Sequence, residues 1–195
     1  MATGSLTNMT VPLSTNTSAS SQGLLMPKLK YRFRVSFINM GLGIGTNELT
    51  KQVMDFTRPN LNFNPITLDV YNSKIYLQGK PEWQAVTATF RDDVNGSVAK
   101  VLSDQIQRQF DFAQQSSAPT GATYKFETMF EVLDGGNGST GSGNVLETWN
   151  MYGCFISEIN YNNFDYKDNE PATITVQLKY DNAIQTLSGG TGTVN

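Results

Sequence analysis

Two adjacent carboxylates, Asp92 and Asp93, are the first residues in this sequence that could do chemistry. Paired carboxylates can act as general acid and general base when their side chains face one another. These two follow an alternating stretch, and an extended backbone would point them to opposite faces. Side-chain oxygens and negative charge also stabilise the free N–H groups at a helix start. We therefore expect Asp92, Asp93 and Asn95 to cap the helix that follows.

Other reactive groups are scarce. The chain has no histidine, which removes the most common general base and metal ligand. Its one cysteine, Cys154, cannot form an internal disulfide and is expected to be a small buried thiol. Residues 165–170 lack the ligand spacing and central glycine of a calcium loop. The sequence therefore predicts no catalytic, cofactor or metal site. An interaction protein is favoured, with an enzyme using carboxylate chemistry as the least favoured class.

The composition indicates a single core with an unusually uncharged surface. Of 195 residues, 38% are hydrophobic and 16% are charged, against a usual charged share of about 25%. This low charge suggests that much of the surface is hidden in contacts with other copies. The net charge of −3 argues against a basic duplex-binding face. We expect no membrane-spanning helix and no signal peptide.

A strand followed by one amphipathic helix is the clearest unit. Residues 83–90 alternate between apolar and polar side chains, which is typical of a half-buried strand. From Val98 the apolar spacing changes to three and four residues, as on a helix. The stripe expected to pack on the β core is Val98, Val101, Leu102, Ile106, Phe110 and Ala113. The helix residues expected in solvent are Lys100, Asp104, Gln107 and Arg108.

Alternation predicts most of the remaining chain to be strands. The longer predicted strands cover residues 28–37, 125–132, 149–159 and 173–180. The expected fold is mainly β, an antiparallel β-barrel or sandwich with one packed α-helix. The expected organisation is a flexible N-terminal arm over 1–26, a β domain over 27–182 and a flexible C-terminal tail over 183–195.

The first of these strands carries a basic row on one face: Lys28, Lys30, Arg32 and Arg34. The favoured interpretation is a solvated row that protects a sheet edge from aggregation. The alternative is contact with an acidic partner.

A long, proline-punctuated excursion over residues 41–74 carries more apolar side chains than a solvated loop would. We expect these to contact another subunit. The subunit-contact candidates are Val53, Phe56, Leu61, Phe63, Ile66 and Leu68.

Three stretches resemble the tail tube proteins of contractile-tailed, T4-like bacteriophages. Residues 72–79 resemble the strand that leaves the family's long loop, and residues 83–93 its tryptophan-led strand with an acidic end. Residues 153–159 and 173–181 resemble its paired C-terminal strands. The resemblance covers residues 27–182 in order. The departures are Ile156, where family members often carry proline, and two additions, the N-terminal arm and the glycine-rich loop at 134–143.

The resemblance implies a phage tail tube-like fold and a structural role in the virion. Subunits of that family form hexameric rings that stack into a hollow tube, through which DNA passes during genome ejection. The long loop bridges to the adjacent ring, so this role is carried to residues 41–74. Implied partners are other copies of the chain, the tail sheath, and baseplate or tail-terminator proteins. The implied location is the phage tail, after synthesis in the host bacterial cytoplasm, without membrane association.

A tube that passes DNA should not have a basic lumen, because each exposed lysine or arginine would hold a phosphate. The basic row is therefore expected to face away from the bore. The threonine- and glutamine-rich strand faces are better lumen candidates, represented by Gln84 and Gln177.

Two kinds of alternative remain. A tube-initiator, cap or secretion-tube protein would share the fold and differ in the assembly it builds. A carbohydrate-binding β-sandwich, suggested by Trp83, Trp149 and the tyrosines, would instead show exposed aromatic side chains in a shallow groove.

Overall fold

The structure is a computed structural model that describes residues 27–41, 46–135, 145–167 and 169–187. The predicted arm over 1–26, most of the glycine-rich loop and residues 188–195 lie outside the described residues. The chain divides into two units, residues 1–32 and residues 33–195. In the described part of the first unit, the Arg32 N–H donates to the Leu29 carbonyl at 3.2 Å and closes a turn. The predicted strand over 28–37 is therefore wrong before Phe33.

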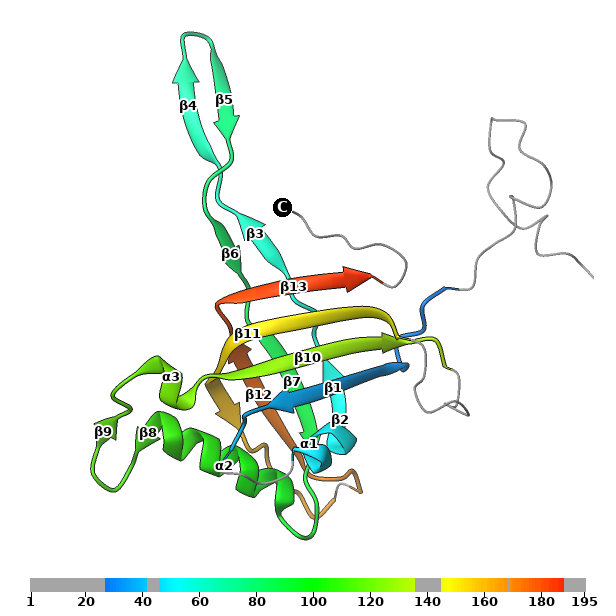
Figure 1. The fold of residues 1–195 in the computed structure, drawn as a ribbon. Helices are drawn as coiled ribbons and strands as arrows, with labels where there is room; N and C mark the ends of the chain where they lie inside the picture. Colours follow the sequence, from blue (N-terminus) through cyan, green and yellow to red (C-terminus); the bar gives the residue numbers. More distant parts are fainter. Residues whose placement is uncertain (1–26, 42–45, 136–144, 168, 188–195) are drawn as a thin grey trace, which may run out of the picture. The chain divides into compact units, whose positions relative to one another are not determined.

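The second unit contains three helices and thirteen strands among its described residues (Figure 1). The helices are α1 (Asn47–Gln52), α2 (Ser97–Gln109) and α3 (Gly121–Tyr124). The first seven strands are β1 (Phe33–Ile38), β2 (Val53–Phe56), β3 (Leu61–Phe63), β4 (Ile66–Val70), β5 (Ser73–Leu77), β6 (Pro81–Trp83) and β7 (Val86–Arg91). The others are β8 (Phe110–Asp111), β9 (Ser116–Ser117), β10 (Phe126–Leu133), β11 (Val145–Asn160), β12 (Thr173–Lys179) and β13 (Asn182–Leu187).

One antiparallel sheet of seven strands builds the body of this unit, in the order β1-β10-β11-β12-β7-β2 with β13 beside β11. The sheet folds over, so that its two ends face each other across the core. Phe37 of β1 lies 5.7 Å from Phe90 of β7, and Phe56 of β2 stacks 5.3 Å from Phe130 of β10, measured between ring centres. The expected mainly antiparallel β class with a packed helix is confirmed.

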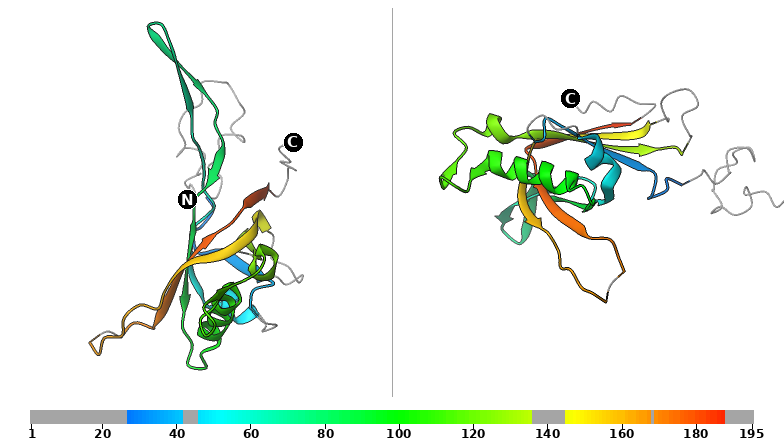
Figure 2. Two further views of the ribbon diagram at one scale, coloured as in Figure 1. Left: turned by 90° about the vertical axis from the view of Figure 1, so that its left-hand side faces the viewer. Right: turned by 90° about the horizontal axis from the view of Figure 1, so that it is seen from below.

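The fold-over occurs where β11 bends (Figure 2). The first part of β11 pairs with β10 and β13, and its last part pairs with β12. The strands β12 and β13 run in one direction along β11 and are interrupted at Asp181, opposite Gly153 of β11. Gly153 has a φ of 69°, which favours glycine, so the bend is encoded at this position. Strand β13 also shows that ordered structure continues beyond the expected domain end at 182.

Helix α2 confirms the predicted helical phase with one addition. Val98, Val101 and Leu102 are buried, whereas Lys100 and Gln107 are exposed. Asp104 and Arg108, expected in solvent, are only partly exposed, and Ile106 is partly buried. The helix ends at Gln109, so Phe110 belongs to β8 and Ala113 to an exposed turn beyond it. The addition is Gln105, which is fully buried on the same stripe.

Asp93 lies before α2 and caps its first backbone N–H groups, as expected. Its Oδ1 accepts hydrogen bonds from the backbone N–H groups of Ser97 at 2.7 Å and Val98 at 3.3 Å. Desolvation alone would raise the pKa of Asp93, but the hydrogen bonds from Ser97 and Val98 outweigh it and lower that pKa. Asp92 instead accepts the N–H of Asp93, and Asn95 is exposed.

Candidate assembly interface

The excursion between β2 and β7 is a long two-stranded ribbon that projects from the sheet (Figure 1). Its base is the β3–β6 pair and its outer part is the β4–β5 hairpin. The two strands of the outer part pair in register from Ile66↔Leu77 to Val70↔Ser73, and Tyr71 and Asn72 make the turn. Within the described residues, β4 pairs only with β5, so this hairpin has no third strand to stabilise it.

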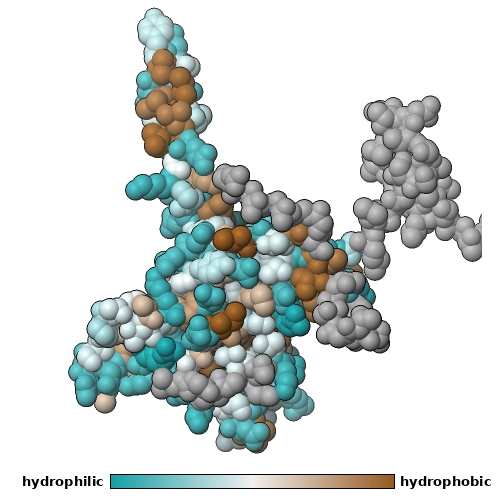
Figure 3. All heavy atoms as spheres, viewed as in Figure 1, coloured by the Kyte–Doolittle hydropathy of each residue, from teal (hydrophilic) through white to brown (hydrophobic). Residues whose placement is uncertain are grey.

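The hairpin has one aliphatic face. Successive strand residues point to opposite faces, which places every second side chain of β4 together with its partners on β5. The aliphatic face consists of Ile66, Leu68, Val70, Ile75 and Leu77. Each of these side chains is between 44% and 53% exposed. Figure 3 shows these apolar side chains gathered on the projecting hairpin. Contiguous exposed apolar surfaces of this kind commonly mark interaction sites.

The opposite face of the hairpin is polar. Thr67 lies across from Tyr76, and Asp69 lies across from Lys74. The Asp69–Lys74 ion pair spans 3.6 Å between exposed side chains and contributes little to stability. The ribbon is therefore amphipathic, with one polar face and one aliphatic face.

A glycine sets the junction between the two parts of the ribbon. A Cβ added to Gly79 would lie 1.8 Å from the carbonyl oxygen of Asn64, so only glycine allows the two strands to approach this closely. Below the junction, Trp83 of β6 lies 5.7 Å from the buried Tyr180, measured between ring centres. The ribbon is thus anchored to the core at its base and leaves the body at Gly79.

The structure separates the six subunit-contact candidates into two groups. Val53 and Phe56 belong to β2 and pack on the core, and Phe56 is only 8% exposed. Because both side chains already pack within the subunit, the prediction that Val53 and Phe56 contact another subunit is corrected. Leu61 and Phe63 lie on β3, and Ile66 and Leu68 lie on the aliphatic face. Sequence reasoning missed Val70, Ile75 and Leu77, although the alternation over 73–77 was visible.

The lumen candidates do not share one row. Gln177 lies on the outer face of β12, opposite Thr87 of β7, whereas Gln84 precedes β7 and donates its backbone N–H to the Asn60 carbonyl. The outer face around Gln177 mixes uncharged and charged side chains. Threonines of β7 and β12 surround Gln177, but Glu158 of β11 lies directly opposite Gln177 and Asp55 of β2 opposite Thr89. Arg91, opposite Thr173, and Lys179 are the cations of this face.

The basic row is divided in the structure. Arg34 alone lies on β1, where its Nε–H donates to Glu131 Oε2 of the neighbouring β10 at 2.7 Å. The hydrogen bond to Glu131 raises the pKa of Arg34. An acidic residue of the same chain, rather than of another copy, balances this member of the row. Lys28, Lys30 and Arg32 lie in the first unit.

Chemistry-bearing groups do not converge elsewhere in the described part of the chain. Cys154 is fully buried, and burial raises the pKa of its thiol to about 11. Among the described residues, no group of three or more acidic or cysteine side chains is placed to hold a metal ion. None of the described helices is long and apolar enough to cross a membrane.

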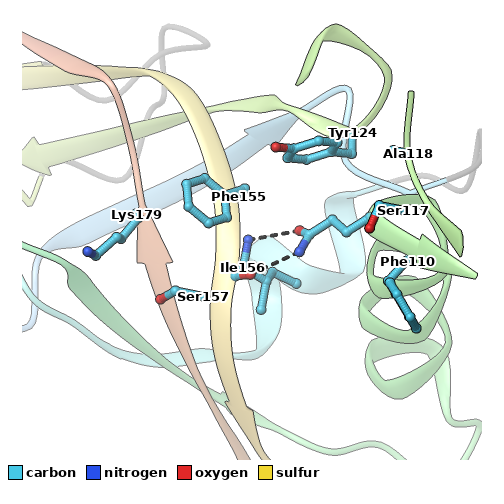
Figure 4. Close-up of a pocket in the computed structure, with 9 residues that line it drawn as sticks. Phe110, Ser117, Ala118, Tyr124, Phe155, Ile156, Ser157 and Lys179 are labelled. Atoms are coloured by element: carbon cyan, nitrogen blue, oxygen red, sulfur yellow. Dashed lines mark hydrogen bonds between the residues drawn. The ribbon is translucent and has the colours of Figure 1, made fainter. Parts of the chain in front are cut away.

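An open cleft of about 570 Å³ lies between the end of α2 and the last part of β11 (Figure 4). The Gln109 side chain spans its floor, accepting from the Ile156 N–H and donating to the Ile156 carbonyl, each at 2.9 Å. The remaining lining residues are Phe110, Ser117, Ala118, Tyr124, Phe155, Ser157 and Lys179.

No protein-family model matches the sequence, and no curated protein matches it either. Solved structures do match the fold. A chain in the cryo-EM structure of the anti-feeding prophage tube-terminating cap aligns with a TM-score of 0.63 at 16% identity, covering 85% of this chain and 95% of that one. The chain has a contractile-tail tube fold.

Two further structures of an extracellular contractile injection system share this tube fold. A chain of the PVC sheath/tube terminator aligns with a TM-score of 0.58 at 16% identity, covering 84% of this chain and 99% of that one. A chain of the PVC sheath–tube complex aligns with a TM-score of 0.57 at 17% identity, covering 89% and 100%. The tube fold implied by the sequence resemblance is therefore confirmed.

Proposed function

We propose that this chain is a structural subunit of a contractile-tail tube, which forms hexameric rings stacked around a lumen for DNA. The observation that carries the proposal is the aliphatic face of the β4–β5 hairpin. This face projects from the body of the subunit with five apolar side chains about half exposed. Burying such side chains is worth up to about 1.5–3 kcal/mol each, so a neighbouring copy that covers them would be held firmly.

The edges of the sheet support a ring. In the described chain, β1 pairs only with β10 and β2 only with β7, which leaves one open edge on each strand. Open edges invite uncontrolled strand pairing. A head-to-tail ring that joins neighbouring subunits would cover them and close the assembly.

The face around Gln177 is suited to a bore. Its threonine and glutamine side chains carry no charge, and Asp55 and Glu158 on the same face offset the cations Arg91 and Lys179 that could hold a phosphate. We infer that Gln177, and with it Gln84, lies towards the lumen and that DNA slides past without specific binding. The subunit would then act in the tail of a phage particle together with sheath, baseplate or terminator proteins, and without enzymatic activity.

A cap, initiator or terminator of the same fold is the second candidate, favoured by the similarity to chains from cap and terminator structures. Such a protein would build a single ring, whereas a tube subunit would build a long polymer. Negative-stain images of the purified protein distinguish the two outcomes. A carbohydrate-binding role is less well supported, because Trp83 and Trp149 are partly buried against the core.

Charge substitutions on the two faces of the hairpin test the proposal. The variant Leu68→Asp with Ile75→Asp places two charges on the aliphatic face, at directly opposed positions. We expect this variant to fold and to form no tubes, since buried charges oppose association. The matched control is Thr67→Asp with Tyr76→Asp, which places the same charges across the polar face. Normal tubes from the first variant, seen in electron micrographs, would contradict the stacking role.

A further inference from the structure

The loop between β11 and β12 presents an aromatic pair around a carboxylate. Phe164 is 86% exposed and Tyr166 is fully exposed, with Asp165 between them. The base of the loop is held in place, since the Asn162 side-chain amide donates to the Thr173 carbonyl at 3.0 Å and the Thr173 hydroxyl at 2.8 Å. Two solvated aromatic rings on an anchored loop indicate a contact that is completed outside the subunit.

The cleft beside Gln109 has the complementary chemistry. Phe155 and Tyr124 form an edge-to-face pair in its wall, with ring centres 6.3 Å apart. Lys179 lies at its rim, across from Phe155 on the paired strands, and is exposed. Figure 4 shows Phe155 between Lys179 and Tyr124. The cleft therefore offers aromatic surface next to a positive charge, which fits an aromatic segment that carries a carboxylate.

A single subunit cannot join its own loop to its own cleft. Both features lie on the β11–β12 pair but at opposite ends, because Phe155 and Lys179 form the first pair and Asn160 and Thr175 the last. Five residues of extended strand separate Phe155 from Asn160, which is roughly 17 Å. The occupant of the cleft must therefore come from another molecule.

We propose that the loop over residues 161–167 of one copy binds in the cleft of a second copy, with Asp165 paired to Lys179. Phe164 and Tyr166 then pack on the cleft aromatics Phe155 and Tyr124. The two surfaces differ, so the contact is head-to-tail and leaves each copy with one loop and one cleft for further copies. This inference rests on the proposed function, in which copies of the chain assemble.

Both partners are held in shape before they meet, which lowers the entropic cost of binding. On the cleft side, Gln109 fixes the backbone of Ile156. Nearby, Asp111 Oδ1 accepts the N–H groups of Ala113 and Gln114 and shapes the β8–β9 turn. On the loop side, Asp165 Oδ1 accepts the N–H of Lys167 at 3.0 Å. The surfaces therefore need little rearrangement to bind.

Charge reversal tests the pairing in the full-length protein. We expect Asp165→Lys and Lys179→Asp each to raise the concentration needed for assembly about tenfold or more, because each places like charges across the contact. The double variant, which exchanges the two charges, should recover assembly. Lys100→Asp, on the exposed face of α2, is the matched control and should neither impair assembly nor rescue Asp165→Lys.

Crosslinking tests proximity without depending on affinity. The Asp165→Cys protein is mixed with the Lys179→Cys protein and treated with a short thiol-to-thiol crosslinker, the natural Cys154 being buried. A heterodimer band, absent when Lys100→Cys replaces Lys179→Cys, supports the contact. If wild-type protein assembles but the reversals change nothing and no band forms, the inference is overturned while the proposed function stands. If wild-type protein stays monomeric at every concentration, the proposed function fails as well.

Discussion

The side-chain amide of Gln109 hydrogen-bonds both the N–H and the carbonyl of Ile156, at 2.9 Å each. These two hydrogen bonds lie just beyond the point where pairing between β10 and β11 ends, at Phe126 and Cys154. The edge of β11 at Ile156 would otherwise lack a partner on that side. The amide of Gln109 therefore takes the place of a strand and ties α2 to the sheet.

Gln109→Ala should lower the free energy of unfolding by about 1–3 kcal/mol, because it leaves two partly buried backbone groups without a partner. Urea unfolding followed by circular dichroism measures the change. Gln107→Ala is the matched control, since Gln107 is exposed two residues earlier on the same helix. Equal stability of the two variants would show that water replaces the Gln109 amide at no cost.

The glutamines of α2 show where sequence reasoning stops. Apolar spacing predicts the buried stripe correctly, because hydrophobic periodicity follows the face that meets the core. It does not identify Gln105, whose Nε2 donates to the Tyr124 carbonyl at 2.6 Å and whose Oε1 accepts the Gly41 N–H at 3.1 Å. Those partners are the last residue of α3 and a loop residue after β1, both distant in sequence, and nothing local specifies them. The spacing of four between Gln105 and Gln109 was the available signal.

The strands also divide into features that the sequence pattern predicts and features that it does not. Alternation locates β7, β10 and β12, because each has one face in the core. It fails over 28–32, where alternating residues form a turn instead, and it misses β13, whose pairing with β11 is set by the bend at Asp181. The sequence identifies the hairpin only as part of a long excursion of apolar character. Its amphipathic faces depend on register, which the sequence of the turn left open.

Gly79→Ala should displace the outer hairpin without unfolding the body. The added Cβ would lie 1.8 Å from the Asn64 carbonyl oxygen, and backbone atoms there must move. We expect a nearly unchanged melting temperature, faster proteolytic cleavage within residues 64–80 and loss of tubes. Gly121→Ala is the control, because its added Cβ meets only the Lys125 side chain at 3.6 Å. A Gly79→Ala protein that resists proteolysis like wild type would contradict the tight junction.

Stability should fall as the pH rises above about 9. Burial raises the pKa of Cys154 from 9.0 to about 11, so the folded state keeps a proton that the unfolded state releases in this range. Below pH 9 both states are protonated and the thiol adds no pH dependence. Between pH 9 and 11 the free energy of unfolding should fall by up to about 1.4 kcal/mol per pH unit.

Urea titrations of wild type and Cys154→Ala at pH 8.0, 9.0 and about 10 separate this effect from other groups. The buried Tyr180, whose pKa burial raises to about 12, adds a similar loss only above its ordinary value of 10.0. The Cys154→Ala protein should therefore show a flatter dependence between pH 9 and 10. Parallel curves for the two proteins would mean that the thiol is not responsible.

The bend of β11 depends on Gly153 and its neighbour Asp181. An added Cβ at Gly153 would lie 2.2 Å from Asp181 Oδ2, and the φ of 69° is strained for any residue with a Cβ. Asp181 is held from the other side by Lys125 Nζ, at 2.6 Å and 2.8 Å from its two carboxylate oxygens. Asp181 can therefore move aside only by weakening this ion pair.

Gly153→Ala should lower the free energy of unfolding by about 1–3 kcal/mol from backbone strain, with a further loss from the clash. Asp181→Ala alone should cost about 0–1 kcal/mol, because it removes an exposed ion pair. In the double variant, Asp181→Ala removes the carboxylate that the new Cβ would meet, so the clash is relieved while the backbone strain remains. The double variant should therefore be more stable than the sum of the two single effects predicts. Urea unfolding of all four proteins measures this coupling. Strict additivity would show that Asp181 does not crowd Gly153, and a Gly153→Ala protein as stable as wild type would show that β11 can bend there without glycine.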